Sequence, residues 1–182
     1  MAYDRYWLLT WTTYGQWLPG DPRGSVTRTR DAGHTTRQEH DQFQTPVVPH
    51  LAGLHQAARQ SLKCEPVRLT LEQAQILIEQ FQQTAAIRNW GLIGVAIMAN
   101  HVHAVVGVIG DPEPATILRD LKSYGSRALN LRYPCPASGT WWTESGSRRK
   151  LPDDPAIQAA IEYLRTQEFP LVIRIADGER RA

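Results

Sequence analysis

An apolar run from Gly91 to Ile109 constrains the fold of this chain more than any other segment. It consists mainly of Val, Ile, Ala, Leu and Gly, and it is interrupted by Asn100-His101-Val102-His103. Such a composition predicts two strands that are joined tightly where the polar residues begin. Alternate side chains of a strand share a face, so we expect His101 and His103 to point to one side of a sheet and Val102 to the other.

Two interpretations of the histidine pair stay open from the strand alone. Neutral imidazole is a common metal ligand, and two imidazoles on one face can converge on an ion or a phosphate. A pair of histidines on a solvated strand face needs no function at all. Polar residues in an otherwise apolar strand favour the functional interpretation, because departures from a local pattern tend to mark sites.

The remaining pattern predicts an α+β fold of the ferredoxin-like (split βαβ) type, an antiparallel sheet with helices packed on one face. The order is strand, helix, strand, strand, helix, strand. Thr70 begins a helix with a capping box, and Pro114 begins a second helix that ends before Pro134. The other predicted elements are a first strand at Tyr6–Tyr14, a short helix from Leu51 to Leu62, a fourth strand or its entry at Gly139–Thr143, a helix from Asp154 to Gln167, and an edge strand or tail at Leu171–Ile175.

A length of 182 residues predicts a single domain, 1–182, with an insertion at about 18–66 between the first strand and the first main helix. The net charge is +2, carried by 17 arginines and 3 lysines against 18 acidic residues. Two cysteines without a spacing pattern give no disulfide framework or zinc ribbon. No segment has the roughly 20 apolar residues of a membrane helix, so we expect a cytoplasmic protein without membrane contact.

Cationic residues suggest contacts with phosphate. Lys122 and Arg127 lie on the second main helix beside Tyr124, whose spacing from Ile117 and Leu121 predicts that it faces the sheet. The tract Arg148-Arg149-Lys150 follows Trp141 and Trp142, a combination in which aromatic rings stack on unpaired bases while cations follow the backbone. Arg23, Arg28 and Arg30 form a second candidate patch in the insertion.

Taken together, Met98-Ala99-Asn100-His101-Val102-His103, Leu121-Lys122-Ser123-Tyr124, the Trp141-Trp142 pair and the later Gly-Ser-Arg-Arg tract resemble the single-tyrosine HUH transposases. The resemblance is to the insertion-sequence-200-like class and the REP-associated tyrosine transposases. It implies a nuclease and strand transferase for single-stranded or hairpin DNA, with a homodimer possible.

The resemblance also implies roles for individual residues. His101 and His103 match paired ligands of Mg²⁺ or Mn²⁺, and Tyr124 matches the nucleophile that forms a 5′-phosphotyrosine. Lys122, Arg127, Arg148, Arg149 and Lys150 would contact the DNA. Family members usually carry a third ligand, Gln, Asn or His, one turn after the tyrosine, where this chain has Ala128. Asp120, Asn130, Glu144 or a water molecule are the alternatives for the third ligand, and Ala99 replaces a common proline.

Three rival functions remain. A histidine-triad nucleotide hydrolase would need a third histidine where Val105 stands. A domesticated hairpin-DNA-binding protein would keep the fold without cleaving, which the alanine at position 128 favours. A binding module of the RNA-recognition type would share the sheet order but give the two histidines no role.

Overall fold

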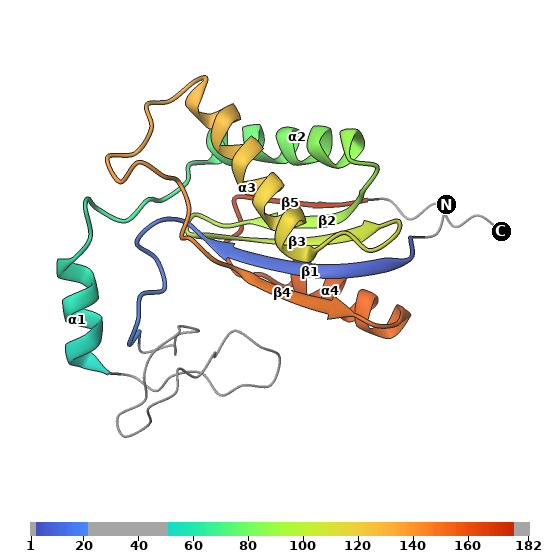
Figure 1. Ribbon diagram of the computed structural model, residues 1–182, viewed down its shortest axis with the longest axis horizontal. Coiled ribbons are helices and arrows are strands. Elements are labelled where there is room, and N and C mark those ends of the chain that lie inside the picture. The colour runs from blue at the N-terminus through green and yellow to red at the C-terminus, as the bar shows by residue number, and fades with distance from the viewer. Residues whose placement is uncertain (1–2, 22–50, 177–182) are drawn as a thin grey trace.

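The computed structural model describes residues 3–21 and 51–176, and it is built on one antiparallel sheet (Figure 1). The sheet has five strands in the order β4-β1-β3-β2-β5. Their bounds are β1 Arg5–Thr12, β2 Gly91–Ile97, β3 His101–Val108, β4 Ser147–Leu151 and β5 Val172–Ile175. The first four follow the ferredoxin-like order, so the predicted fold class is confirmed.

Helices cover both faces of this sheet. On one face, α2 (Leu71–Ile87) and α3 (Pro114–Asn130) enclose the larger core with alternate residues of β3, among them Val102 and Val106. On the other face, α4 (Asp154–Arg165) packs on Leu8, Val105 and Leu151. The expected arrangement with helices on one face therefore holds for α2 and α3 but not for α4. The strand alternation allows this, because both faces of β1 and β3 carry apolar residues.

Local signals fix where these helices begin. The side chain of Thr70 accepts a hydrogen bond from the backbone N–H of Gln73, whose side chain bonds the backbone of Thr70 in return, as the capping box predicts. The carboxylate of Asp153 accepts a hydrogen bond from the N–H of Ala156 at the start of α4.

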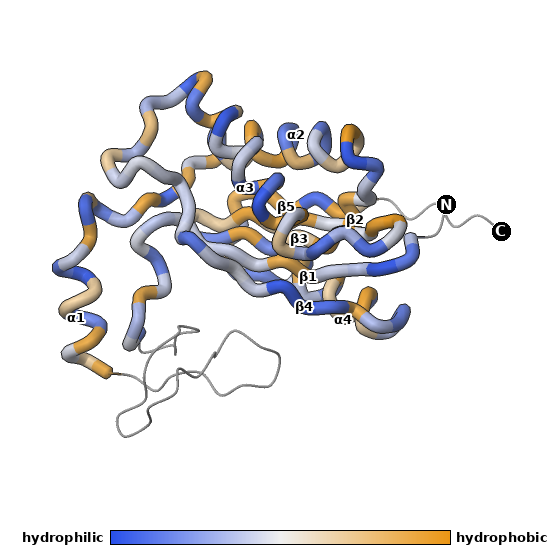
Figure 2. Tube along the Cα trace, in the orientation of Figure 1, coloured by the Kyte–Doolittle hydropathy of each residue, from blue (hydrophilic) through white to orange (hydrophobic). Residues whose placement is uncertain are grey.

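The fourth strand lies later in the chain than expected. Residues 139–143 form no strand beyond an isolated bridge of Trp142 to Thr13, and β4 lies instead on the basic tract. Trp141 and Trp142 are each only 4% exposed and belong to the larger core. Figure 2 shows β4 as a hydrophilic strand, in keeping with its place at the sheet edge.

The insertion contributes α1 (Ala52–Gln60), which stands beside the end of the sheet at which β3 begins (Figure 1). The middle of the insertion, with Arg23, Arg28 and Arg30, lies outside the described residues. Among the described helices, none is long and apolar enough to cross a bilayer.

Candidate active site

The two histidines lie together at the start of β3, on the face that α4 covers. Their ring centroids are 4.8 Å apart, with the ring planes nearly perpendicular. His101 opposes Thr12 and His103 opposes Thr10 on β1, so the four side chains share one face. The predicted convergence of the two imidazoles is therefore present in the structure.

His103 is held from both of its ring nitrogens. It is 4% exposed, its Nδ1 lies 2.7 Å from Thr10 Oγ1, and its Nε2 lies 3.2 Å from the hydroxyl of Tyr163. Burial, and secondarily the neighbouring His101, lower the pKa of His103 from 6.5 to about 3. The ring is consequently neutral at physiological pH, which is the form that ligates a metal.

Asn100 fixes the orientation of His101. The side-chain oxygen Oδ1 of Asn100 lies 2.7 Å from His101 Nδ1. An amide oxygen only accepts hydrogen bonds, so Nδ1 carries the proton of this contact, and in the neutral ring Nε2 then has the lone pair. A backing partner on one ring nitrogen is the usual arrangement behind a metal-binding histidine, and Thr10 stands in the same relation to His103.

Tyr163 is the tyrosine that the fold brings to these histidines. It lies on α4, and its ring centroid is 5.0 Å from that of His103 in an edge-to-face arrangement. Its side chain is 44% exposed, so the hydroxyl contacts His103 while the ring remains accessible from solvent. A phenol at the rim of a histidine pair can act as a nucleophile toward a ligand held there.

Gln167 follows Tyr163 by four residues. Its Nε2 donates to the backbone carbonyl of Tyr163 at 2.9 Å, which anchors the amide at the carboxyl end of α4 and leaves Oε1 as a possible ligand. The sequence carried this signal, since a glutamine one turn after a tyrosine is the spacing that the resemblance implies. The prediction of Tyr124 leaves out Tyr163 and Gln167, although the position one turn after Tyr124 is Ala128.

The structure does not bring Tyr124 to the histidines. Tyr124 lies on α3, whose buried residues pack on the opposite face of the sheet. It is half-buried there, with the guanidinium carbon of Arg127 5.1 Å from its ring centroid. The buried stripe of α3 continues from Leu121 to Gly125 and Leu129 instead of Tyr124 and Ala128. At Gly125, α2 approaches so closely that an added Cβ would be 2.9 Å from Leu77.

The three alternative third ligands lie elsewhere as well. Asp120 is buried on α3 and pairs with Arg88 at 2.8 Å. Asn130 accepts a hydrogen bond from the indole nitrogen of Trp141 at 2.8 Å. Glu144 is exposed in the segment before β4. Among the described residues, no group of three His, Cys, Asp or Glu could hold a metal.

Lys122 contacts the protein rather than open solvent. Its ammonium group donates to the backbone carbonyls of Thr143, Glu144 and Ser145. Burial lowers the pKa of Lys122 to about 8, and the charge of Glu144 opposes this shift. These contacts tie α3 to the segment that leads into β4.

The basic tract is divided between the two faces of the sheet. Arg149 opposes Leu8, which packs under α4, so Arg149 shares the face of the histidines. Arg148 opposes Leu9 and Lys150 opposes Trp7, both of which pack under α2 and α3. The three cations of the tract therefore cannot form one patch on one face.

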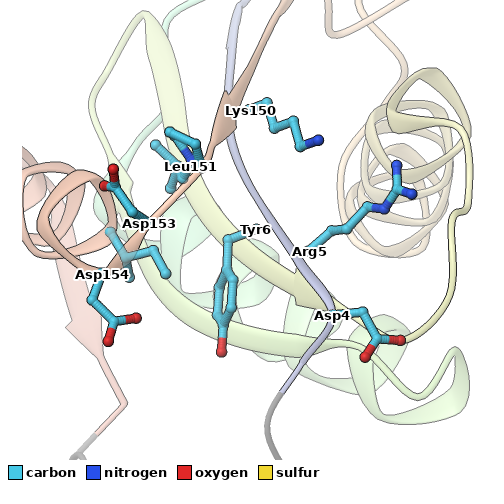
Figure 3. Close-up of a pocket in the computed structure, with 9 residues that line it drawn as sticks. Asp4, Arg5, Tyr6, Lys150, Leu151, Asp153 and Asp154 are labelled. Atoms are coloured by element: carbon cyan, nitrogen blue, oxygen red, sulfur yellow. The ribbon is translucent and has the colours of Figure 1, made fainter.

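Two cavities lie apart from the histidines. A groove of about 1110 Å³ runs between α3 and the segment before β4, and its lining includes Arg119, Ser123, Ser126 and Arg148. A smaller cavity of about 270 Å³ lies between the start of β1 and the start of α4 (Figure 3), with Tyr6 and Lys150 in its lining. Neither contains a residue of the histidine pair or Tyr163.

Comparisons with known proteins match part or most of the chain. The family model described as "Transposase IS200 like" matches residues 61–167. Two solved structures are similar over most of the chain. One is a REP-associated tyrosine transposase bound to a REP hairpin, with 11% identity, a TM-score of 0.48, and coverage of 90% of this chain and 67% of the other. The second is a protein from Deinococcus radiodurans R1 whose transposase assignment is provisional, with 14% identity, a TM-score of 0.46, and coverage of 93% and 95%. A search of curated proteins finds no match.

Proposed function

Because the chain belongs to the IS200-like transposase family, a family of HUH nucleases, we propose that it cleaves and rejoins single-stranded DNA through Tyr163. The observation that carries this proposal is the position of the Tyr163 hydroxyl, 3.2 Å from His103 Nε2 on the face that His101 also occupies. Tyr124, the nucleophile that the motif comparison suggested, lies on the other side of the sheet.

The residues present fit a divalent ion. His101 and His103 would offer Nε2 atoms, each backed at Nδ1 by Asn100 or Thr10, and Gln167 would offer an amide oxygen. When bound, Mg²⁺ or Mn²⁺ would polarise the scissile phosphate and stabilise the charge that develops on it. Gln167, one turn after Tyr163, would supply the amide ligand that the resemblance implies and that Ala128 could not supply.

The chemistry of the chain's own residues follows from this arrangement. The oxygen of Tyr163 attacks phosphorus and its phenol proton passes to solvent. The bond from phosphorus to the 3′ oxygen breaks, and that oxygen leaves as a hydroxyl after taking up a proton. The enzyme then carries a 5′-phosphotyrosine that retains the phosphodiester linkage energy, so a second 3′ hydroxyl can reverse the step without a nucleotide cofactor.

DNA in hairpin or single-stranded form is the proposed partner, and a homodimer remains part of the proposal. Arg149 would contact the strand on the catalytic face, while Arg148 and Lys150 would contact DNA that passes the sheet edge toward α3. Arg127 lies over the ring of Tyr124, and Lys122 donates to backbone carbonyls. We therefore assign both residues to positioning α3 rather than to contact with the reacting DNA.

The decisive experiment is a covalent-adduct assay. The protein is incubated with single-stranded hairpin DNA and Mn²⁺, and adducts are separated on a denaturing gel. We expect Tyr163→Phe to abolish the adduct and Tyr124→Phe, the matched control, to retain it. EDTA should remove the adduct from the wild type, and added Mn²⁺ should restore it.

Other results of this assay would refute the proposal. An adduct that survives Tyr163→Phe but disappears in Tyr124→Phe would show that Tyr124, on α3, is the nucleophile. Retention of hairpin DNA by the wild type without any adduct would indicate a binding protein that no longer cleaves. Circular dichroism melting of each variant checks that a lost adduct is not a lost fold.

A further inference from the structure

Phe169 is the most unusual exposed residue near the proposed site. Its side chain is 90% exposed, the highest value among the exposed large hydrophobic residues that the structure describes. Its backbone is in the left-handed region, with a φ of 51°. Non-glycine residues with bulky side chains rarely adopt this conformation, and the following residue, Pro170, restricts position 169 further.

The connection that contains Phe169 is anchored at both ends to neighbours of the histidine motif. At its beginning, Tyr163 contacts His103 and Gln167 is anchored on Tyr163. At its end, the N–H of Leu171 donates to the carbonyl of Ile97 at 2.8 Å, on the strand that precedes the histidine motif. Since Ile97 pairs with Val102, Phe169 lies in the connection between α4 and β5 at the end of the sheet where β3 begins.

The two tryptophans that the sequence suggested for contact with bases are not available. Trp141 and Trp142 are buried in the core between the sheet and α3. A strand that reacts at Tyr163 places at least one unpaired base close to the catalytic residues. Base faces stack on aromatic side chains with a gain of about 1–3 kcal/mol per base, whatever the base identity.

We propose that Phe169 is a stacking platform for an unpaired base next to the scissile phosphate. An exposed phenylalanine in a disfavoured backbone conformation reduces the stability of the fold. Proteins tend to keep such strained residues at sites where the side chain has a function. This inference rests on the proposed function of Tyr163, and it adds a residue that sets the affinity and position of the strand.

A fluorescence titration tests the proposal independently of cleavage. The probe is a short thymidine oligonucleotide with a single 2-aminopurine, titrated into the Tyr163→Phe protein so that no adduct forms. Stacking on Phe169 should quench the fluorescence. We expect Phe169→Ala to remove the quenching and weaken binding about ten- to a hundred-fold, and Phe169→Trp to restore both.

Ile87→Ala is the matched control. Ile87 is 82% exposed at the end of α2, next to the start of β2, which is at the opposite end of the sheet from the histidines. Its truncation should leave quenching and affinity unchanged. Phe169→Asn should melt no lower than the wild type, because asparagine tolerates the left-handed region, and it should bind as weakly as Phe169→Ala.

Three outcomes would overturn the proposal. They are unchanged quenching and affinity in Phe169→Ala, full rescue of both by Phe169→Leu, and a changed sedimentation of Phe169→Ala without any effect on DNA, which would make Phe169 a contact between copies. The two proposals can fail separately. If Phe169→Ala loses the fluorescence quenching but the covalent adduct survives Tyr163→Phe, then Tyr163 is not the nucleophile and Phe169 is still the stacking residue.

Discussion

Thr10 determines how His103 is presented to the site. Its hydroxyl is 2.7 Å from His103 Nδ1, and metal binding at Nε2 requires the proton on that Nδ1, with the hydroxyl as acceptor. We expect Thr10→Val to reduce metal-dependent adduct formation about 10–100-fold, as loss of a backing partner typically does. Thr10→Ser should retain activity. Equal activity of the valine and serine variants would contradict this role.

The depressed pKa of His103 makes the metal-free fold sensitive to acid. The pKa is about 3 in the folded chain against 6.5 for an unperturbed histidine. Between these values the unfolded chain binds a proton that the folded chain does not, so the free energy of unfolding falls as the pH drops from 6.5 toward 3. The loss is on the order of 3–5 kcal/mol.

Urea unfolding at a series of pH values in EDTA measures this effect. The wild type should lose stability steadily below pH 6.5, and His103→Gln should show a shallower dependence, because glutamine does not titrate. Parallel curves for the two proteins would show that His103 does not carry the acid sensitivity. The comparison concerns folding only and does not depend on DNA or on the nucleophile.

At the scale of elements, the contact between α2 and α3 decides which residues of α3 face the core. A Cβ at Gly125 would lie 2.9 Å from Leu77 Cδ2 and 3.0 Å from Phe81 Cε1, and Phe81 is fully buried. Gly125→Val should therefore destabilise the protein by about 1–3 kcal/mol through overpacking. Urea unfolding with an unchanged slope measures the difference.

Gly53 provides the matched control within a helix. It lies in α1, where an added Cβ meets no atom within 4 Å. Gly53→Ala should be neutral or stabilising by up to about 1 kcal/mol, since alanine has the higher helix propensity. Equal destabilisation by both substitutions would show that the approach of α2 does not specifically limit the size of residue 125.

At the scale of the whole molecule, the two faces of the sheet divide the cations of β4. Arg149 shares the face of the histidines, whereas Arg148 and Lys150 share the face of α3. We expect Arg149→Gln to slow adduct formation at saturating DNA. Arg148→Gln and Lys150→Gln should weaken binding without slowing the reaction, each lowering the slope of log affinity against log salt by about 0.7.

Salt titrations and single-turnover adduct rates separate these effects. The prediction fails if Arg149→Gln reacts at the wild-type rate when DNA is saturating, or if Arg148→Gln slows the reaction while binding normally. If the DNA strand instead followed one continuous basic patch, the three glutamine variants would have the same effect on binding and on rate. The division of the cations between the two faces of the sheet predicts two classes of variant, one that slows the reaction and one that weakens binding.

The sequence by itself determined most of the elements and the strand that carries the histidine pair. The alternation around Val102 placed His101 and His103 on one face, and the capping pattern at Thr70 located the start of α2. These features depend on a few neighbouring residues, so a linear pattern can reveal them. The sequence placed the fourth strand too early because an adjacent Trp141-Trp142 pair suggests a strand as strongly as it suggests a core.

Only the tertiary structure decided which tyrosine meets the histidines. Tyr124 and Tyr163 both lie on helices, and Tyr163 also has Gln167 at the right spacing. A helical stripe tells which residues face a sheet, but it cannot tell which of the two faces the helix covers. That choice depends on the apolar residues that β1 and β3 present on each side, and these place α3 against Val102 and α4 against Val105.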